Sequence, residues 1–448
     1  MQSNQFNNNQ FYQGMMNNNF NNNYMNNFNN SYNNSFNNNN IINNSNNTNF
    51  MNNNNINNNN PTNNKKPEPK DPKDIIKNEY KSPTLIGLNN IGATCFMNST
   101  IQCLSQTKQL TNFFLNQNNN NIIINNNIAL KNRNDNQLSP VFCDLIKKLW
   151  DKNGPKSFSP NEFRIKVEQM NPLFAQGQAG DSKDFIIFIL EQLHKELKRP
   201  IKQKKTTTKP PLNQYDKNNA LSYFFDDFQN DLSIISDVFF GFTETTNECL
   251  NCKQIYNFQG LFGPICYNYG IINCIIFPLE EVKNFKNSYM QNQNIQMNEN
   301  NRVSIYECFF YYQKTELFTG ENRNYCNKCK QLYDSNYTTR IFSSPNSLIL
   351  ILNRGKGNIY KVKLDFTETI DITQFILQKD KPNMIYNLYG VITHLGKSGP
   401  DAHFIASCKS PVDNKWYRYN DAFVTPVNNI QKEVIEFGTP YILFYQKN

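Results

Sequence analysis

The sequence predicts an α+β fold, because helical and strand patterns fall in different parts of the chain. Apolar residues at helical spacing occur at Met97, Ile101 and Leu104. A second apolar helix is expected to begin after Asp181, a suitable N-cap residue with an acid three positions later. Residues 343–352 instead carry the apolar run of a buried strand.

Residues 1–64 form a low-complexity tail without a charged side chain, and 33 of the first 60 residues are Asn. The tail has no helical or strand periodicity and cannot bury enough apolar surface to offset its chain entropy, so we expect it to be disordered. It also lacks the basic start and apolar core of a signal peptide. Residues 65–84 are expected to form a charged linker. The remaining chain of about 370 residues is ample for one large domain with an inserted subdomain.

Composition narrows the expected partners and compartment. No run of about 18 apolar residues occurs, so no membrane span is expected. The 11 cysteines, an odd number without a secretory signal, fit a reducing compartment, and we expect an intracellular protein of the cytoplasm, the nucleus or both. Much of the net charge of +9 is local, since residues 195–209 carry seven Lys or Arg against one Glu. This Lys-rich loop, at about 198–218, lacks interleaved aromatic residues, so nucleic-acid binding is not expected.

Cys95 lies in a segment that favours a reactive thiol. Residues 87–99, GLNNIGATCFMNS, place it just before the first apolar helix. At a helix N-terminus, unpaired backbone N–H groups and the helix dipole favour a thiolate over a thiol. Most free cysteines are small buried apolar residues, however, and position alone does not decide between the two roles.

Only three histidines could assist such a thiol, namely His194, His394 and His403. His194 lies near the end of the second apolar helix, where a capping or packing role is expected. His394 and His403 are therefore the candidates for a general base.

Two CxxC pairs occur, Cys249 with Cys252 and Cys326 with Cys329. Each could present two thiolates to a tetrahedral zinc ion. The 73 residues between the pairs exceed the spacing that identifies a zinc ribbon by itself. The pattern alone therefore also allows four unligated cysteines.

The segment around Cys95 resembles the cysteine box of the ubiquitin-specific proteases, a family of ubiquitin carboxyl-terminal hydrolases. Residues 386–391 (YNLYGV), through His394 and His403 to residues 416–421 (WYRYND), resemble the histidine box of that family. Both boxes occur in the family's order, and the final segment TPYILFY resembles its closing strand.

The similarity covers residues 85–446, which are expected to form the catalytic domain. It implies a papain-like cysteine peptidase with a helical thumb up to about Pro200. A zinc-ribbon-like fingers insertion is expected at about 240–340, together with a β palm that carries the histidine box.

The resemblance also implies a role for each site residue. Cys95 falls on the nucleophile, His403 on the general base and Asn420 on the residue that orients the imidazole. Asp421 falls beside it as a supporting acceptor, and Asn90 falls on an amide donor to the oxyanion. From the residues alone, Asn420 and Asp421 could equally form a turn, and Asn90 could be a chance match in an Asn-rich chain.

Two further positions have an implied role near the site. Asp181 matches a residue that holds the C-terminal tail of ubiquitin, and capping of its helix is an equally good explanation. His394 matches a position beside the active site that does not take the proton.

The four CxxC cysteines fall on the zinc ligands of the family's fingers, so a structural zinc and no catalytic cofactor are expected. The chain departs from the family at Ala179 and Gly180, where the family has two glutamines, and at Ala402, where it has a glycine. None of these departures removes a reacting atom.

The resemblance thus implies a thiol protease of the ubiquitin conjugation pathway. Such a deubiquitinase hydrolyses the peptide or isopeptide bond after the C-terminal glycine of ubiquitin through a thioester. Ubiquitin or ubiquitinated proteins are the expected partners of a monomeric catalytic domain. Two alternatives stay open: a protease for another ubiquitin-like modifier, and a weakly active or inactive ubiquitin-binding scaffold.

Overall fold

The computed structural model describes residues 74–116, 137–175, 180–199, 211–258, 264–292, 302–354, 362–379, 382–396 and 402–448. The chain divides into two units, Met1–Pro69 and Lys70–Asn448. The predicted disordered tail, residues 65–73 of the linker and residues 200–210 of the Lys-rich loop lie outside the described residues, and Ile75–Glu79 of the predicted linker form a helix.

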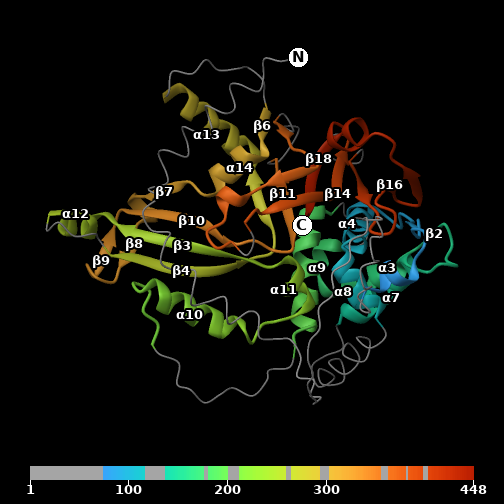
Figure 1. The fold of residues 1–448 in the computed structure, drawn as a ribbon, viewed down its shortest axis with the longest axis horizontal. Helices are drawn as coiled ribbons and strands as arrows, with labels where there is room; N and C mark the ends of the chain where they lie inside the picture. The colour runs from blue at the N-terminus through green and yellow to red at the C-terminus, as the bar shows by residue number, and fades with distance from the viewer. Residues whose placement is uncertain are drawn as a thin grey trace, which may run out of the picture. The chain divides into compact units, whose positions relative to one another are not determined.

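The N-terminal part of the described chain is helical, as the sequence predicts. Its helices are α3 (Ile75–Glu79), α4 (Cys95–Ser105), α5 (Lys108–Leu115), α7 (Ser139–Leu149), α8 (Asn161–Met170), α9 (Ser182–Glu196) and α11 (Ile234–Phe239). They gather in one group beside strands β14 and β16 (Figure 1). Helix α4 is enclosed by α5 and α9 on one side and by β14, β15 and β16 on the other. Every one of its 11 residues is buried, including the polar ones.

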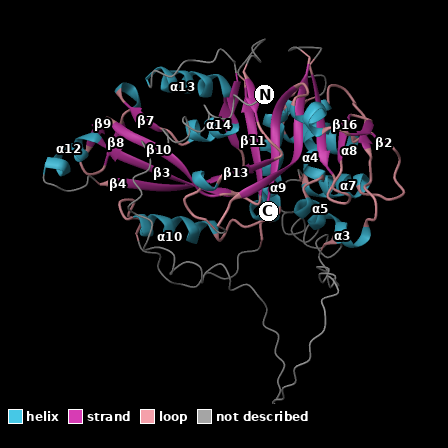
Figure 2. Ribbon diagram, turned by 45° about the horizontal axis from the view of Figure 1, so that its top comes forward, coloured by secondary structure: helices cyan, strands magenta, loops and turns pink. Residues whose placement is uncertain are grey.

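The second layer is an eight-stranded sheet in the order β17-β16-β15-β14-β18-β11-β5, with β13 paired to β14 (Figure 2). Its strands are β5 (Ile275–Pro278), β11 (Ser347–Asn353), β13 (Thr369–Asp371), β14 (Ile385–Leu395), β15 (His403–Lys409), β16 (Trp416–Asn420), β17 (Phe423–Pro426) and β18 (Thr439–Lys447). The predicted buried strand is β11, whose residues 347–352 are all buried. Helix α4 packs against β15, so the main core lies between the helices and this sheet.

A separate four-stranded sheet, in the order β4-β3-β10-β7, extends to the left in Figure 1. Its strands are β3 (Gly241–Cys249), β4 (Ile265–Ile272), β7 (Thr315–Phe318) and β10 (Ser335–Ser343). The hairpin β8 (Asn324–Cys326) and β9 (Gln331–Tyr333) and helix α12 (Leu250–Phe258) lie at its outer end (Figure 2). Helix α10 (Lys217–Phe228) covers one face through a cluster of rings, with Phe228 and Phe242 centred 4.8 Å apart.

The range 240–340 expected for the fingers also contains elements of the palm. Strand β5 runs parallel to β11 in the large sheet. Helices α13 (Leu279–Asn292) and α14 (Ile305–Tyr312) follow it, and strand β6 (Arg302–Ser304) pairs with β12 (Lys363–Asp365). The fingers therefore consist of two separate stretches, residues 241–272 and 315–343.

Short elements complete the described chain. Strand β1 (Gly87–Leu88) pairs in parallel with β2 (Ser157–Phe158) ahead of α4. Three 3₁₀ helices lie at Pro172–Phe174, Gly320–Asn322 and Thr373–Phe375, and a π-helical turn lies at Gln431–Ile435.

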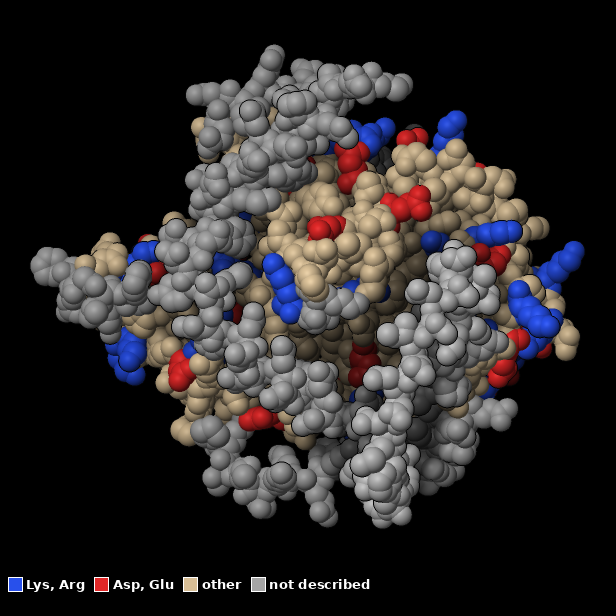
Figure 3. All heavy atoms as spheres, viewed as in Figure 1, with Lys and Arg blue, Asp and Glu red and all other residues tan. Residues whose placement is uncertain are grey.

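Two surface properties bear on partners. No helix among the described residues is long and apolar enough to cross a membrane. On the described part of the face drawn in Figure 3, Lys and Arg lie interspersed with Asp and Glu.

Candidate active site

Cys95 is the first residue of α4, as expected, and it is 8% exposed. Gly92 and Ala93, three and two positions before Cys95, have φ of 109° and 54°. Such left-handed conformations disfavour side chains with a Cβ, so the strain at Ala93 marks a constrained loop. Thr94 is the N-cap residue, but its side chain does not cap the helix. The first-turn N–H groups of α4 are thus not taken up by that hydroxyl.

The loop before Cys95 is held from two directions. Asn90 Oδ1 accepts hydrogen bonds from the backbone N–H of Thr94 at 3.1 Å and of Gly92 at 3.3 Å. On the other side, the Arg164 guanidinium donates to the Ile91 carbonyl oxygen. The loop conformation is therefore fixed by side chains as well as by its own backbone.

His403 begins β15 and lies between the thiol and the end of β16. Its Nε2 is 2.7 Å from Asn420 Oδ1. An amide oxygen only accepts, so Nε2–H donates this bond and Nδ1 is the nitrogen left for the thiol. The hydrogen bond with the Cys95 side chain is the largest cause that raises the pKa of His403 to about 9; Asn420 and Asp421 raise it further and burial opposes them. The imidazole is therefore protonated at neutral pH beside the sulfur.

Asp421 plays a different part from its neighbour Asn420. Its Oδ2 is 3.9 Å from His403 Nε2, too far for a hydrogen bond. This Oδ2 instead accepts from Asn90 Nδ2 at 3.0 Å, and Oδ1 accepts from Asn98 Nδ2 at 2.8 Å. The Asp421 carboxylate therefore links the nucleophile loop to helix α4.

The backbone around Asp421 tightens the same link. Asp421 has φ of 48°, and its carbonyl oxygen accepts from the Leu88 N–H at 2.9 Å. Strand β1 comes so close that a Cβ at Gly87 would lie 2.3 Å from the Ala422 carbonyl oxygen. Only glycine fits there, so Gly87 lets the end of β16 reach the segment before Cys95.

The other two histidines occupy packed environments. His394 on β14 is 3% exposed, and its ring lies 5.0 Å from that of Phe404. Burial is the largest cause that lowers the pKa of His394. His194, in the last turn of α9, bonds to Ser233 Oγ at 2.7 Å and to Asp231 Oδ2 at 3.3 Å. The His194 ring also lies 4.7 Å from the Phe240 ring, so of the predicted capping or packing role the packing part is confirmed.

Asp181 caps α9, as predicted from the sequence. Its Oδ1 accepts from the Lys183 N–H at 2.9 Å. Its Oδ2 accepts from the Tyr441 hydroxyl of β18 at 2.6 Å and from Lys183 Nζ at 2.9 Å. The carboxylate thus connects the helices to the palm.

The departure from the family at Gly180 has a packing reason. A Cβ at this position would lie 2.4 Å from the Phe96 ring, which directly follows the nucleophile. The Phe96 carbonyl oxygen also accepts from Ser182 Oγ at 3.3 Å. The start of α9 therefore lies directly against the start of α4. Ala179 lies outside the described residues.

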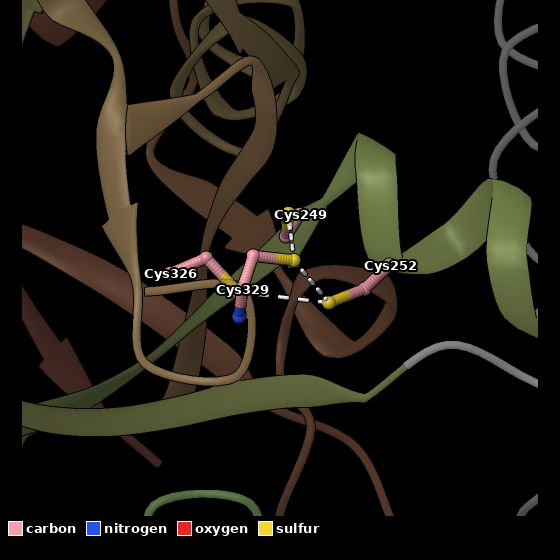
Figure 4. Close-up of side chains that lie close together, drawn as sticks. All are labelled: Cys249, Cys252, Cys326 and Cys329. Carbon is pink, nitrogen blue, oxygen red and sulfur yellow. Dashed lines mark hydrogen bonds between the residues drawn. The ribbon is translucent and has the colours of Figure 1, made fainter. Parts of the chain in front are cut away.

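The four CxxC cysteines meet at the outer end of the fingers. Cys249 and Cys252 come from the junction of β3 with α12, and Cys326 and Cys329 from the β8–β9 turn (Figure 4). Their sulfur atoms all lie within 4.8 Å of one another. The separations are 4.0 Å for Cys249–Cys329, 3.6 Å for Cys252–Cys326 and 3.1 Å for Cys252–Cys329.

This cluster has the donor set of a metal site. A tetrahedral zinc ion with Zn–S bonds of about 2.3 Å places its sulfurs about 3.8 Å apart, close to the observed separations. Without a metal, burial is the largest cause that raises the pKa of Cys249 and Cys252, whereas backbone N–H groups of Cys329 and Lys328 lower the pKa of Cys326 to about 7 against the effect of burial. The four residues can therefore hold a metal, one of the two possibilities that the CxxC pattern left open.

Two polar residues beside the site were not singled out from the sequence. Asn98 carried no distinctive signal, because Ser99, Thr100, Gln102 and Ser105 on the same helix are also polar and buried. Arg164 carried none, because a basic residue on a surface helix usually faces solvent.

Comparisons with known proteins agree with this arrangement. The family model described as ubiquitin carboxyl-terminal hydrolase matches residues 86–445. Ubiquitin carboxyl-terminal hydrolase 2 of Bos taurus is 25% identical over 375 residues, which are 82% of this chain and 56% of the relative. Ubiquitin carboxyl-terminal hydrolase 21 of Homo sapiens is 27% identical over 384 residues, 81% of this chain and 61% of the relative. This chain therefore spans less than two thirds of the length of these relatives.

A solved structure gives the same fold. The SAGA Ubp8/Sgf11/Sus1/Sgf73 DUB module bound to ubiquitin aldehyde contains a chain that matches with a TM-score of 0.56 and 20% identity. The match covers 82% of this chain and 70% of the other. With the family match over residues 86–445, this α+β chain with its four-cysteine fingers belongs to the ubiquitin carboxyl-terminal hydrolase family.

Proposed function

We propose that this chain is a thiol-dependent deubiquitinase that hydrolyses the peptide or isopeptide bond after the C-terminal glycine of ubiquitin. The observation that carries the proposal is the placement of the His403 imidazole between the Cys95 thiol and Asn420 Oδ1. Nucleophile, base and orienting group in this order are what acyl transfer by a thiol requires. Family membership supplies the substrate class.

The acylation step uses the protonated His403 imidazole beside the Cys95 sulfur. The Cys95 thiolate attacks the carbonyl carbon of the terminal glycine, and the carbonyl electron pair moves onto oxygen. The protonated His403 then gives its proton to the lysine amine as the C–N bond breaks, which leaves a thioester on Cys95. Asn420 keeps the imidazole in line through both transfers because it fixes Nε2.

Hydrolysis uses the same groups in reverse. His403, now neutral, accepts a proton from water, and the hydroxide attacks the thioester carbonyl. The thiolate departs, the imidazole is again protonated, and ubiquitin leaves with a free carboxylate. Both steps pass through an oxyanion, and the Asn90 side-chain amide is the proposed donor to it.

For the fingers we propose one structural zinc ion, held by Cys249, Cys252, Cys326 and Cys329. The sulfur separations and the all-thiolate donor set support zinc over harder cations, which prefer oxygen ligands. When bound, zinc would fix α12 and the β8–β9 hairpin to the end of β3. No chemical step requires it.

We further propose ubiquitin and ubiquitinated proteins as the partners, engaged by a monomeric catalytic domain in the cytoplasm, the nucleus or both. The expectation that Asp181 contacts the ubiquitin tail belongs to this proposal. So does the expectation that the Asn-rich tail and its linker lie outside the catalytic domain.

The direct test is covalent labelling with ubiquitin that carries a C-terminal electrophile, beside equal probes built on other ubiquitin-like modifiers. Labelling of Cys95 by the ubiquitin probe alone is the expected result. Labelling by another modifier's probe would change the substrate class. If no probe reacts while immobilised ubiquitin still retains the protein, the chain is a binding scaffold.

A further inference from the structure

We propose that Asn98 is a positioning residue that aims the Asn90 amide at the oxyanion by holding the Asp421 carboxylate. The inference rests on the proposed function, because an oxyanion forms only if the chain carries out acyl transfer. It concerns a residue three positions after the nucleophile, on the same helix. Its role is separable from that of Asn90 itself.

Asn98 donates to oxygens from two different segments. It is 2% exposed, and its Nδ2 lies 2.8 Å from Asp421 Oδ1. The same nitrogen lies 3.1 Å from the Leu88 carbonyl oxygen and 3.4 Å from that of Asn89. One N–H thus serves the carboxylate and the other serves the segment that leads into the nucleophile loop.

These partners fix the orientation of the amide. All three neighbours of Nδ2 are oxygens that can only accept from it. Reversing the amide would place Asn98 Oδ1 against these oxygens and remove every one of the bonds. Asn98 Oδ1 has no hydrogen-bond partner among the described residues. The side chain is therefore oriented by its donor end.

The Asp421 carboxylate passes this orientation on. Asn98 holds Oδ1, while Oδ2 accepts from Asn90 Nδ2 at 3.0 Å. A carboxylate is planar, so fixing one oxygen on α4 limits where the other can receive the Asn90 N–H. Asn90 Oδ1 is held at the same time by the Thr94 N–H at 3.1 Å. With one Nδ2 hydrogen on Asp421, the second is the one available for the oxyanion.

Through Asn98, the position of the Asn90 donor is tied to helix α4, which also carries the nucleophile Cys95. Asn98 and Cys95 are three residues apart on α4 and lie on the same side of it. A small rotation of the Asn90 amide would spoil its distance to the oxyanion, and catalysis is sensitive to such displacements. Asn98 prevents that rotation through Asp421, without touching the substrate.

Helix α4 also supplies a matched control. Gln102 lies one turn later, is likewise 2% exposed, and its Nε2 donates to the Ile86 carbonyl oxygen at 3.0 Å. It ties the same N-terminal segment to the helix through an amide, without the carboxylate. Removing either amide should lower stability, but only Asn98 should influence Asn90.

The experiment is a double-mutant cycle in the full chain, with ubiquitin bearing a C-terminal fluorogenic amide as substrate. Asn98→Ala is expected to lower kcat by about 10- to 10²-fold with KM changed less than about twofold. In the Asn90→Ala background, the same change should lower kcat by less than about twofold, because the group it positions is absent. Gln102→Ala should lower the melting temperature similarly and leave kcat within about twofold.

Two results would overturn the inference. One is an equal fold-loss of kcat from Asn98→Ala with and without Asn90; the other is an equal loss in Gln102→Ala. A second cycle, in urea unfolding of the Asn98→Ala and Asp421→Ala variants, needs no substrate. Additive effects on the unfolding free energy there would also overturn it. Failure of the unaltered protein to cleave the substrate would instead remove the proposed function, before any variant is compared.

Discussion

Asn420 Oδ1 accepts a 2.7 Å hydrogen bond from His403 Nε2, whereas the carboxylate of the next residue, Asp421, stays 3.9 Å from that nitrogen. The two side chains diverge because Asn420 ends β16 and Asp421 turns into the left-handed region with φ of 48°. One neighbour therefore orients the base, and the other binds Asn90 and Asn98.

Asn420→Ala should reduce kcat by roughly 10- to 10³-fold with little change in KM, because the imidazole loses the acceptor that fixes its direction. Asn420→Asp preserves an acceptor and should keep substantial activity. Steady-state kinetics with fluorogenic ubiquitin measures both. Near-normal turnover in Asn420→Ala would show that another residue orients the base.

The protein's three histidines permit a direct test of the raised pKa of His403 by NMR titration. His403 should titrate well above an ordinary histidine, at about 9, because the Cys95 side chain holds its proton. His194 and His394 should titrate below the ordinary value, since burial lowers the pKa of both. Cys95→Ala removes the main partner and should move only the His403 resonance strongly downward. If the His403 resonance does not move in Cys95→Ala, the thiol is not the group that raises the pKa of His403.

The sign of the resulting pH dependence follows from the raised pKa. The folded-state pKa of His403 lies above the unfolded value of about 6.5. Its stabilising contribution is therefore complete below about 6.5 and is lost as pH rises through about 9. Activity should decline over the same alkaline limb, since the leaving amine then finds no proton on the imidazole. The Cys95→Ala variant should lack this stability change in pH-dependent unfolding.

The two candidate bases can be distinguished by mutation. His403→Ala should slow turnover by several orders of magnitude, and Cys95→Ser should abolish probe labelling while the fold is kept. His394→Ala should affect kcat much less, because this ring packs against Phe404 as part of the core. A circular-dichroism melt of each variant separates lost packing from lost chemistry. If the effects of the two histidines were reversed, His394 would be the base.

Purified protein should contain about one zinc ion per chain by elemental analysis. Cys249→Ser should lose the ion, lower the melting temperature and weaken ubiquitin binding, with kcat largely retained. Cys266→Ser is the matched control, because this fingers cysteine lies on β4 and its Sγ bonds to Gln214 Oε1 at 3.5 Å instead. If protein prepared without chelator contains no zinc, the proposed structural zinc site is wrong.

Asp181→Ser should separate capping from substrate binding. Serine keeps an N-cap oxygen for the start of α9 but removes the charge. If the carboxylate holds the ubiquitin tail, KM should rise several-fold while the melting temperature changes little. Tyr441→Phe is the control, because it removes only the 2.6 Å bond from the palm. An equal rise of KM in both variants would assign the effect to the lost bond between thumb and palm.

Much of the site could be predicted because local sequence sets local chemistry. The position of Cys95 at a helix start and the N-cap role of Asp181 depend on a few neighbouring residues, and both hold in the structure. The two CxxC pairs also converge, as the family resemblance implied and their wide spacing alone did not. The prediction that His403 lies beside Cys95 and Asn420 came from family resemblance, because no local sequence rule relates residues so far apart.

The remaining features depend on contacts that sequence reasoning cannot rank. Asn90 meets Asp421 across 331 positions, and Asn98 meets it across 323. In an Asn-rich chain, no pattern distinguishes these two asparagines from the rest. Likewise, only the position of the Phe96 ring explains why Gly180 replaces a bulkier residue of the family. Such choices are made by tertiary packing.

The position of β18 in the palm sheet has a consequence for folding during synthesis. This strand follows all other described strands in sequence, yet it lies inside the sheet between β14 and β11. During synthesis, the edges of β14 and β11 that pair with β18 therefore stay unpaired until residues 439–447 leave the ribosome. Cys95 is synthesised long before β18, and His403 only 36 positions before Thr439, but the sheet that carries His403 cannot close until β18 is available. A chain in which β18 is not yet paired therefore lacks the complete sheet that carries His403 beside Cys95.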